Sequence, residues 1–435
     1  MTAADVARVV GGAVEGSAVA RLFGAEVDSR RLEDGDLFVA LPGARRDGHE
    51  FVGQALETAV AALVRRDADL EEPPSERALV RVAAVTGSVA KTTTKDFLAA
   101  LLAPHHRVGA SQGNRNSTLG LPAEILSQDP EIEVFVAEAG MSSPGELATL
   151  GKILRPQLLL YTRIAPVHTE FFPDLEGIVR AKAELLPWLD DEGTLVINAN
   201  DPNQDGYPSK TEARVIRYGG EDAEARIEDV EDRGLLGCRF RLVLPDGEAE
   251  IDLNLPGQHQ AENLLAAAAA ASAFGVRAEQ VAATAPDLVA PEHRGRVIAV
   301  GDGISLVDDS YNASPLAVGR LLELLARAPG RRVAVLGEMY ELGDLAEEAH
   351  RDAGAKAATA CDLLVAVGGA DAGRIADGAR DAGQPNESIY QVEDADRAAE
   401  LLRRVLRPGD VVLVKGSRGV GLDRTVAALT GEEAA

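Results

Sequence analysis

Residues 86–93 of the chain (Thr-Gly-Ser-Val-Ala-Lys-Thr-Thr) have the composition of a phosphate-binding loop. The segment follows an apolar, β-rich run and precedes a stretch with helical periodicity, so N–H groups at the start of a helix would face a bound anion. Lys91 would bind β- and γ-phosphates, and Thr92 would hold Mg²⁺. The pattern predicts a nucleotide site formed by Gly87, Ser88, Val89, Ala90, Lys91, Thr92 and Thr93.

The match of this loop to the general pattern G-x-x-x-x-G-K-[ST] is incomplete. The loop is short, and Ala90 stands where the second glycine belongs. If the backbone at Ala90 is left-handed, an alanine there costs about 1–2 kcal/mol. An ordinary strand-to-helix turn is the alternative interpretation.

Three side chains with metal-binding chemistry follow two later apolar runs. Glu138 ends the run VFVAEAG, and His168 and Glu170 lie in APVHTEFF. All three would lie at the carboxyl ends of strands, where open α/β sheets bind ligands. Carboxylate and imidazole groups there suit a divalent metal, although each residue alone is more often a structural polar group.

Lysine is scarce in this chain, with 7 lysines against 37 arginines. A lysine that is kept in such a chain is a candidate for chemistry that arginine cannot supply, such as a compact ammonium or a neutral amine nucleophile. Lys91, Lys182 and Lys415 are therefore of interest. Weaker candidates, each of which could equally be a helix cap or a turn residue, are His259, Asn263, Arg294, Arg296, Asp308, Asp309 and Asn312.

Alternating strand-like and helix-like runs predict an α/β protein with parallel sheets. Residues 1–78 read as a small α/β domain, 79–296 as a central domain that carries the phosphate loop, and 297–435 as a Rossmann-like domain without the G-x-G-x-x-G fingerprint. Charged, β-like segments around residues 237–255 predict an antiparallel extension of the central domain. The alanine-rich run near 265–273 reads as a buried helix face.

Length and composition limit the possible functions. A chain of 435 residues suggests about three domains. Its net charge of −26 disfavours nucleic acid and anionic membranes as partners. The N-terminus lacks a signal-peptide pattern, no run of 18 apolar residues occurs, and two distant cysteines do not form a metal or disulfide framework. We expect a cytoplasmic monomer without membrane insertion.

Several motifs together resemble the Mur ligase family over essentially the whole chain. The N-terminal segment DSRRLEDGDLFVALPGARRDGHEF is similar to the family's substrate-binding segment. The central motifs are TGSVAKTTTK, GNRNSTLGLP, EAGMSSPGEL, HTEFF and AKAELL, and the C-terminal motifs are DDSYNASP, VLGEMYELGD and VKGSRG. The resemblance implies three domains: an N-terminal UDP-substrate domain, a central P-loop ATPase domain with a parallel sheet, and a C-terminal Rossmann-like domain for the amine substrate.

The resemblance also implies an activity. The chain would be an ATP- and Mg²⁺-dependent amide ligase that adds D-alanyl-D-alanine to UDP-N-acetylmuramoyl-tripeptide (UDP-MurNAc-peptide) through an acyl phosphate, in peptidoglycan precursor synthesis. The alternatives are a ligase of the same type for a different carboxylate and amine, and a nucleotide-binding paralogue without turnover.

Site residues follow from the same resemblance. Lys91 and Thr92 would serve the ATP phosphates and a first Mg²⁺ with Glu138, while His168 and a carbamylated Lys182 would support a second Mg²⁺. Asn263 would contact the adenine, Arg296 the γ-phosphate, and Asp309 and Asn312 the nucleoside or the domain junction. Lys415 would face the acyl intermediate or the dipeptide. The UDP end of the substrate would be bound by Ser29, Arg30, Asp47 and His49.

The sequence departs from the family pattern at four positions. Ala90 replaces a glycine, Ser117 and Arg163 each replace an asparagine, and Asn200 replaces an aspartate. Ser117 and Arg163 favour the alternative of a changed substrate pair, and Ala90 favours the alternative of lost turnover.

Overall fold

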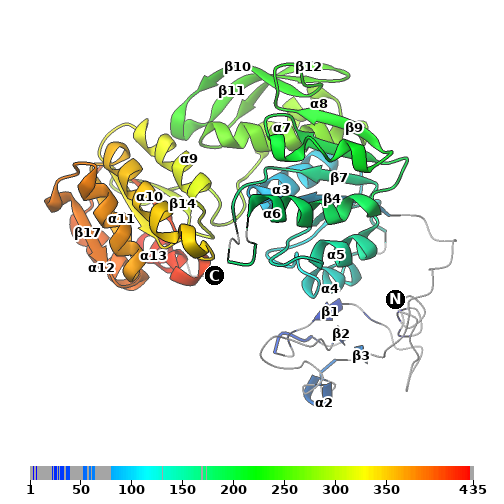
Figure 1. Cartoon of the computed structure of the whole chain (residues 1–435), viewed down its shortest axis with the longest axis horizontal. Coiled ribbons are helices and arrows are strands. Elements are labelled where there is room, and N and C mark those ends of the chain that lie inside the picture. The colour runs from blue at the N-terminus through cyan, green and yellow to red at the C-terminus, as the bar shows by residue number, and fades with distance from the viewer. Residues whose placement is uncertain are drawn as a thin grey trace.

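The computed structural model describes residues 80–431 apart from 130, 168, 169 and 173, together with short stretches before residue 80. Three bodies follow one another along the chain (Figure 1). Among the described residues before 80, three short parallel strands form one sheet in the order β1-β2-β3, with a helical turn, α2. Their bounds are β1 Gly24–Glu26, β2 Asp36–Val39, α2 Val52–Ala55 and β3 Ala61–Leu63.

The central body is built on a parallel six-stranded sheet of order β5-β6-β4-β7-β8-β9. Residues of β4 alternate between two cores: Ala83 and Val85 pack with α3 and α7, and Ala84 packs with α5 and α6. Both faces are therefore covered, as expected for a parallel sheet. The bounds are β4 Arg81–Thr86, α3 Lys91–Leu102, β5 Val108–Ala110, α4 Gly120–Leu126, β6 Val134–Glu138, α5 Glu146–Leu154, β7 Leu158–Tyr161, α6 Leu175–Lys182, β8 Thr194–Asn198 and β9 Arg214–Tyr218.

The predicted antiparallel extension is present as a separate three-stranded sheet. It consists of β10 Arg226–Asp232, β11 Cys238–Leu244 and β12 Gly247–Leu253, and it packs on α7 Gln258–Ser272 and α8 Ala278–Thr284. The alanine run of α7 is buried on every side rather than on one face, since residues 266–271 are all at most 2% exposed. The helix is enclosed because this small sheet and the central sheet cover it from two directions.

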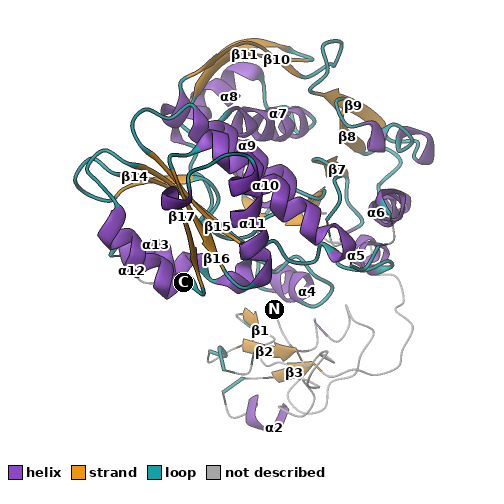
Figure 2. Cartoon of the chain, turned by 60° about the vertical axis from the view of Figure 1, so that its left-hand side comes forward, coloured by secondary structure: helices purple, strands orange, loops and turns teal. Residues whose placement is uncertain are grey.

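The C-terminal body has a six-stranded sheet of order β13-β14-β18-β15-β16-β17, antiparallel only between β13 and β14. Helices α9, α10 and α11 cover one face, and α12 and α13 cover the other (Figure 2). The bounds are β13 Arg296–Ala299, β14 Ser305–Asp309, α9 Pro315–Ala326, β15 Arg332–Gly337, α10 Ala346–Ala360, β16 Leu363–Val367, α11 Ala370–Asp381, β17 Ile389–Val392, α12 Ala395–Val405, β18 Val411–Lys415 and α13 Leu422–Thr430. The expected domain limits at 78/79 and 296/297 stay predictions.

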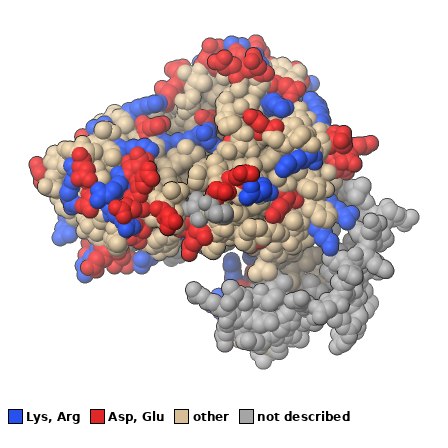
Figure 3. Space-filling view, viewed as in Figure 1, with Lys and Arg blue, Asp and Glu red and all other residues tan. Residues whose placement is uncertain are grey.

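Charge on the surface is mixed in sign. On the face that Figure 3 shows, Lys and Arg side chains are interspersed with Asp and Glu. Many of them pair, as Arg351 does with Asp381 at 2.8 Å and Arg397 with Glu400 at 2.8 Å. Within the part of the chain that the structure describes, no helix is long and apolar enough to span a membrane.

Candidate active site

The loop between β4 and α3 is fixed by the segment that follows β7. The Thr162 hydroxyl donates to the carbonyl of Val89 at 2.7 Å, and the Ser88 N–H donates to the carbonyl of Arg163 at 2.7 Å. Gly87 has a φ of 149°, and a Cβ there would lie 1.9 Å from the Thr162 hydroxyl oxygen. Only glycine therefore fits at the point where β4 turns toward the helix.

Ala90 immediately precedes α3 and has φ 66° and ψ 4°, which is left-handed. The backbone at Ala90 is therefore left-handed, which is the case considered in the sequence analysis. An alanine in this conformation costs about 1–2 kcal/mol. No side chain caps the start of α3. Its first N–H groups are thus available to an anion, which is the arrangement that binds phosphate.

Lys91 curls back over the loop, with Nζ 3.3 Å from the carbonyl oxygen of Ser88. Desolvation lowers the pKa of Lys91, and the nearby charge of Glu138 opposes that shift. The side chain lines the cleft and can swing toward a phosphate, which would replace the carbonyl as its partner.

Glu138 ends β6 and holds both of its carboxylate oxygens in hydrogen bonds. Thr92 donates from Oγ1 to Oε2 at 2.7 Å, and Asn116 donates from Nδ2 to Oε1 at 2.7 Å. A carboxylate and a hydroxyl are hard oxygen ligands of the kind that Mg²⁺ prefers, with water and phosphate oxygens completing its shell. Among the described residues, no group of three acidic, histidine or cysteine side chains is arranged to hold a metal ion.

Lys182, the last residue of α6, is 3% exposed and lies behind the phosphate loop. Its Nζ donates to the carbonyl of Gly87 at 2.9 Å. The Tyr161 hydroxyl holds this helix end by donating to the carbonyl of Lys182 at 2.7 Å. Burial, with Lys91 nearby, holds the pKa of Lys182 well below that of a free lysine. The neutral amine that carbamylation requires is therefore favoured.

The C-terminal body supplies the opposite wall of the site. Asp309 and Lys415 end the adjacent parallel strands β14 and β18 and are register partners. Lys415 Nζ lies 3.3 Å from Asp309 Oδ1 and donates to the carbonyl of Asn312 at 2.7 Å. Burial lowers the pKa of Lys415 and raises that of Asp309, so each is held less strongly charged than in water.

These two walls enclose one cleft of about 550 Å³. The predicted residues that line it are Ser88, Val89, Ala90, Lys91, Thr92, Thr93, Glu138, His259, Asn263, Arg294, Asp309, Asn312 and Lys415. The structure thus brings together groups that are more than 300 residues apart in the chain. Gly87 and Lys182 lie directly behind the loop rather than on the cleft wall.

Arg296 does not line this cleft, and the contact with the γ-phosphate expected for it stays a prediction. It begins β13, where it pairs with Asp308 across the antiparallel ladder, and its side chain is exposed. Arg294, two residues earlier, lines the cleft instead, with its guanidinium carbon 4.0 Å from the centre of the Tyr311 ring. Arg294 lies in a turn before the strand, where His293 (φ 57°) and Gly295 (φ 86°) are left-handed, so strand alternation does not relate the two side chains. Glu170 is exposed and does not line the cleft either.

The predicted substrate residues fall mostly outside the described part of the chain. Ser29, Asp47, His49 and the predicted metal ligand His168 are not among the described residues. Arg30 is described and exposed, and it pairs with Asp28 at 2.6 Å. This contact lowers the pKa of Asp28 to about 2.

Sequence reasoning missed several cleft residues. Asn116 holds Glu138, and its signal was its place in the motif GNRNS. Tyr311, Tyr340 and Arg418 also line the cleft, and all three lie within or next to the C-terminal motifs. Their types were visible in the sequence, but only the fold shows that their side chains face the site.

Comparison with known proteins identifies the class. Residues 24–108 match the Mur ligase family, catalytic domain; 85–271 match the Mur ligase middle domain; and 293–418 match the Mur ligase, glutamate ligase domain. The chain belongs to the Mur ligase family.

Particular relatives are more informative still. The chain is 34% identical to the UDP-N-acetylmuramoyl-tripeptide--D-alanyl-D-alanine ligase of Mycobacterium tuberculosis strain H37Rv, over 100% of this chain and 98% of that protein. It is 32% identical to the ligase of the same name from Bacillus subtilis, over 93% and 92%. A crystal structure of MurF from Acinetobacter baumannii superposes with a TM-score of 0.84 at 26% identity, covering 99% of both chains. MurF ligase from Thermotoga maritima in complex with ADP superposes with a TM-score of 0.77 at 28% identity, covering 95% of this chain and 98% of that one.

Proposed function

We propose that this chain joins D-alanyl-D-alanine to the terminal carboxylate of UDP-N-acetylmuramoyl-tripeptide at the expense of ATP. The observation that carries the proposal is the cleft, in which a phosphate loop on the central body faces the Lys415–Asp309 pair on the C-terminal body. Full-length relatives named for this reaction, and the ADP complex of one structural relative, support it.

The central wall is assigned to ATP and metal. Lys91 and the first N–H groups of α3 bind the phosphates, and Asn263 contacts the adenine. Thr92 and Glu138 hold Mg²⁺, and His168 with a carbamylated Lys182 holds a second ion. Bound Mg²⁺ supplies charge neutralisation on the transferring phosphoryl group.

The reaction has two steps. A carboxylate oxygen of the tripeptide attacks the γ-phosphorus, the bond to the β,γ-bridging oxygen breaks, and ADP leaves. The amino nitrogen of the dipeptide then attacks the acyl carbon, the C–O bond to phosphate breaks, and phosphate leaves with the new amide formed. Lys415, with Asn312 and Asp309 beside it, faces the acyl group from the C-terminal wall. Closing the two walls on each other keeps water from the acyl phosphate.

The N-terminal residues Ser29, Arg30, Asp47 and His49 are assigned to the UDP end of the substrate on the resemblance alone. We further propose that the protein acts as a cytoplasmic monomer, where ATP and nucleotide-linked precursors are available.

The alternative of a different substrate pair receives no support from the cleft. Ser117 accepts a hydrogen bond from the Gly120 N–H at 3.2 Å, at the start of α4, and is not on the cleft wall. Arg163 uses its backbone to hold the phosphate loop, and its side chain is not on the wall either. The two departures that favoured this alternative therefore lie outside the wall of the cleft.

An omission series tests the proposal. Phosphate release is measured with ATP, Mg²⁺, UDP-MurNAc-tripeptide and D-alanyl-D-alanine, leaving out one component at a time, and the product is identified by mass. Release that requires all four, with pentapeptide formed, is the expected result. Phosphate release that proceeds without the dipeptide, or no pentapeptide from the complete mixture, would contradict the proposal. The variant K91M should lose turnover, whereas K356M, a surface control in α10, should not.

A further inference from the structure

Arg418 is an exposed arginine on the C-terminal wall of the cleft, three residues after Lys415. Its Nη1 donates to the Tyr311 hydroxyl at 3.2 Å, and its guanidinium carbon lies 5.3 Å from the centre of that ring. In the described part of the chain no carboxylate pairs with Arg418, whereas the nearby Arg424 pairs with Asp396 at 3.1 Å. Arg418 is thus a cation held in place without a counter-ion, in a strongly acidic protein.

A second arginine, Arg294, also lies on the Tyr311 ring and lines the cleft. Arg294 lies 4.0 Å from the Tyr311 ring centre, and its charge lowers the pKa of Lys91 on the phosphate loop as well as that of Lys415. Arg294 therefore lies near the lysines of both walls. Arg418 projects from the C-terminal body alone, on the loop that follows β18.

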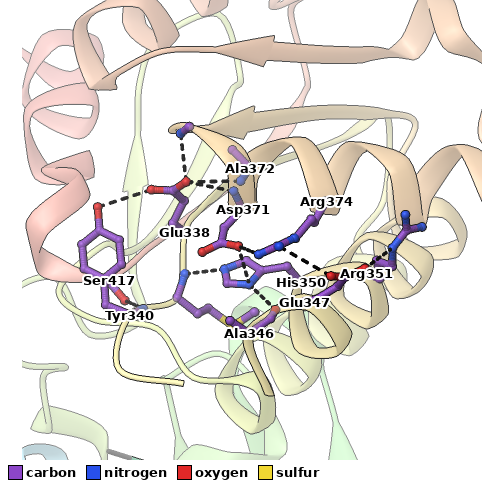
Figure 4. A network of polar contacts seen from close by, with 12 residues as sticks. Glu338, Tyr340, Ala346, Glu347, His350, Arg351, Asp371, Ala372, Arg374 and Ser417 are labelled. Atoms are coloured by element: carbon purple, nitrogen blue, oxygen red, sulfur yellow. Dashed lines mark hydrogen bonds and ion pairs between the residues drawn. The ribbon is translucent and has the colours of Figure 1, made fainter. Parts of the chain in front are cut away.

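Tyr340 extends the wall beside Arg418. A Cβ at Gly419 would lie 2.6 Å from Tyr340 Cε2, so the tyrosine ring lies against the backbone next to Arg418. The Tyr340 N–H donates to Ser417 Oγ at 2.9 Å, and its hydroxyl donates to Glu338 Oε2 at 3.4 Å (Figure 4). The wall is thus an ordered surface that presents one ring and one guanidinium to the cleft.

Glu338 anchors this wall to the C-terminal sheet. Its Oε1 accepts from the N–H groups of Gly369 at 2.9 Å and Asp371 at 3.2 Å, at the start of α11 (Figure 4). The carboxylate therefore satisfies a helix N-terminus that would otherwise attract an anion. Lys415 on this wall pairs with Asp309, whereas Arg418 has no carboxylate partner among the described residues.

The chemistry of the second substrate fits this arrangement. Its amino nitrogen must reach the acyl carbon beside the phosphates, and a dipeptide extends about 7 Å from that nitrogen to its carboxylate. That carboxylate is the only charge left on the nucleophile, and a guanidinium binds a carboxylate through two parallel hydrogen bonds. We propose that Arg418 binds the C-terminal carboxylate of the incoming dipeptide, with Tyr340 covering its side chain. The inference rests on the proposed function and names the amine subsite within it.

The test compares D-alanyl-D-alanine with its C-terminal amide, which keeps the nucleophile and removes the carboxylate charge. KM for each is measured at saturating ATP and UDP-MurNAc-tripeptide in the wild type, R418A, R418K and R397A. Loss of a charge-assisted pair should raise KM for the dipeptide in R418A by at least about tenfold. R418A should also lose the wild-type preference for acid over amide, and R418K, which keeps the charge without the planar fork, should lie between.

The controls separate binding from folding. R397A removes an equally exposed arginine on α12 and should behave as the wild type. KM for ATP should stay unchanged in R418A, and the thermal midpoints of the variants should agree because Arg418 is exposed. An R418A enzyme that still prefers the acid to the amide, or whose KM for ATP rises as much as that for the dipeptide, would overturn the inference alone. A wild type that makes no product from the dipeptide would overturn the proposed function and the inference with it.

Discussion

Replacing Ala90, the residue that immediately precedes α3, by glycine should stabilise the protein. The left-handed backbone at Ala90, with φ 66°, costs an alanine about 1–2 kcal/mol, and glycine avoids this cost. Glycine loses about 0.5–1 kcal/mol through its greater freedom in the unfolded chain. The net gain expected for A90G is about 0.5–1 kcal/mol, or about 1–4 °C in the midpoint of the central domain.

The matched control lies at the other end of the same helix. Ala103 follows α3 with φ −55°, an ordinary right-handed conformation, and is exposed. A103G should therefore lose about 0.5–1 kcal/mol. Scanning calorimetry of both variants without nucleotide measures the two shifts in thermal midpoint. Both substitutions flank α3, so both shifts report on the unfolding of the central domain. Shifts of the same sign, or a lower midpoint for A90G than for the wild type, would refute the reasoning about the backbone at Ala90.

Three further substitutions have defined outcomes. Burial holds the pKa of Lys415 in the folded protein below its unfolded value of 10.5. Between these two values the unfolded chain binds more protons than the folded one, so the free energy of unfolding rises with pH. In denaturant titrations from pH 8 to 10, the wild type should therefore gain stability relative to K415M, and a constant difference between the two would contradict this. E138Q should weaken the Mg²⁺ dependence of nucleotide binding with little change in the thermal midpoint. Calorimetric titration with ATP, with and without Mg²⁺, measures this dependence. An unchanged effect of Mg²⁺ would count against a metal at this carboxylate. His350 Nε2 accepts a hydrogen bond from the Met339 N–H at 2.8 Å, so H350A leaves a buried donor unpaired. The free energy of unfolding, measured with urea, should fall by about 1–3 kcal/mol. A fall no larger than that of a surface alanine substitution would show that water replaces the imidazole.

The sequence predicted the elements well because their signals are local. The apolar runs ending at Thr86 and Glu138 are strands, and both end at the edge of the sheet where the cleft forms. The fold class and the antiparallel extension are confirmed for the same reason. A parallel sheet covered on both faces requires continuous apolar strands, and these stand out in any sequence.

Contacts across the chain were not visible in this way. Nothing local indicated that Lys182 would donate to Gly87, 95 residues earlier, or that Tyr161 would hold the helix end that places it. Arg294 lies in a left-handed turn and Arg296 begins β13, and only the fold shows that Arg294 lines the cleft and Arg296 does not. The roles of the site residues, including His168 outside the described chain, remain predictions.

The division of the cleft between two bodies also bears on how such enzymes diversify. The phosphate loop and Glu138, to which we assign activation of the acid, belong to the central body, whereas Arg418 and Tyr340, to which we assign the amine, belong to the C-terminal body. Choice of nucleophile and activation of the carboxylate are thus encoded in separate stretches of sequence. On these assignments, substitutions in the C-terminal body can change the amine that is used while activation of the carboxylate in the central body is left intact.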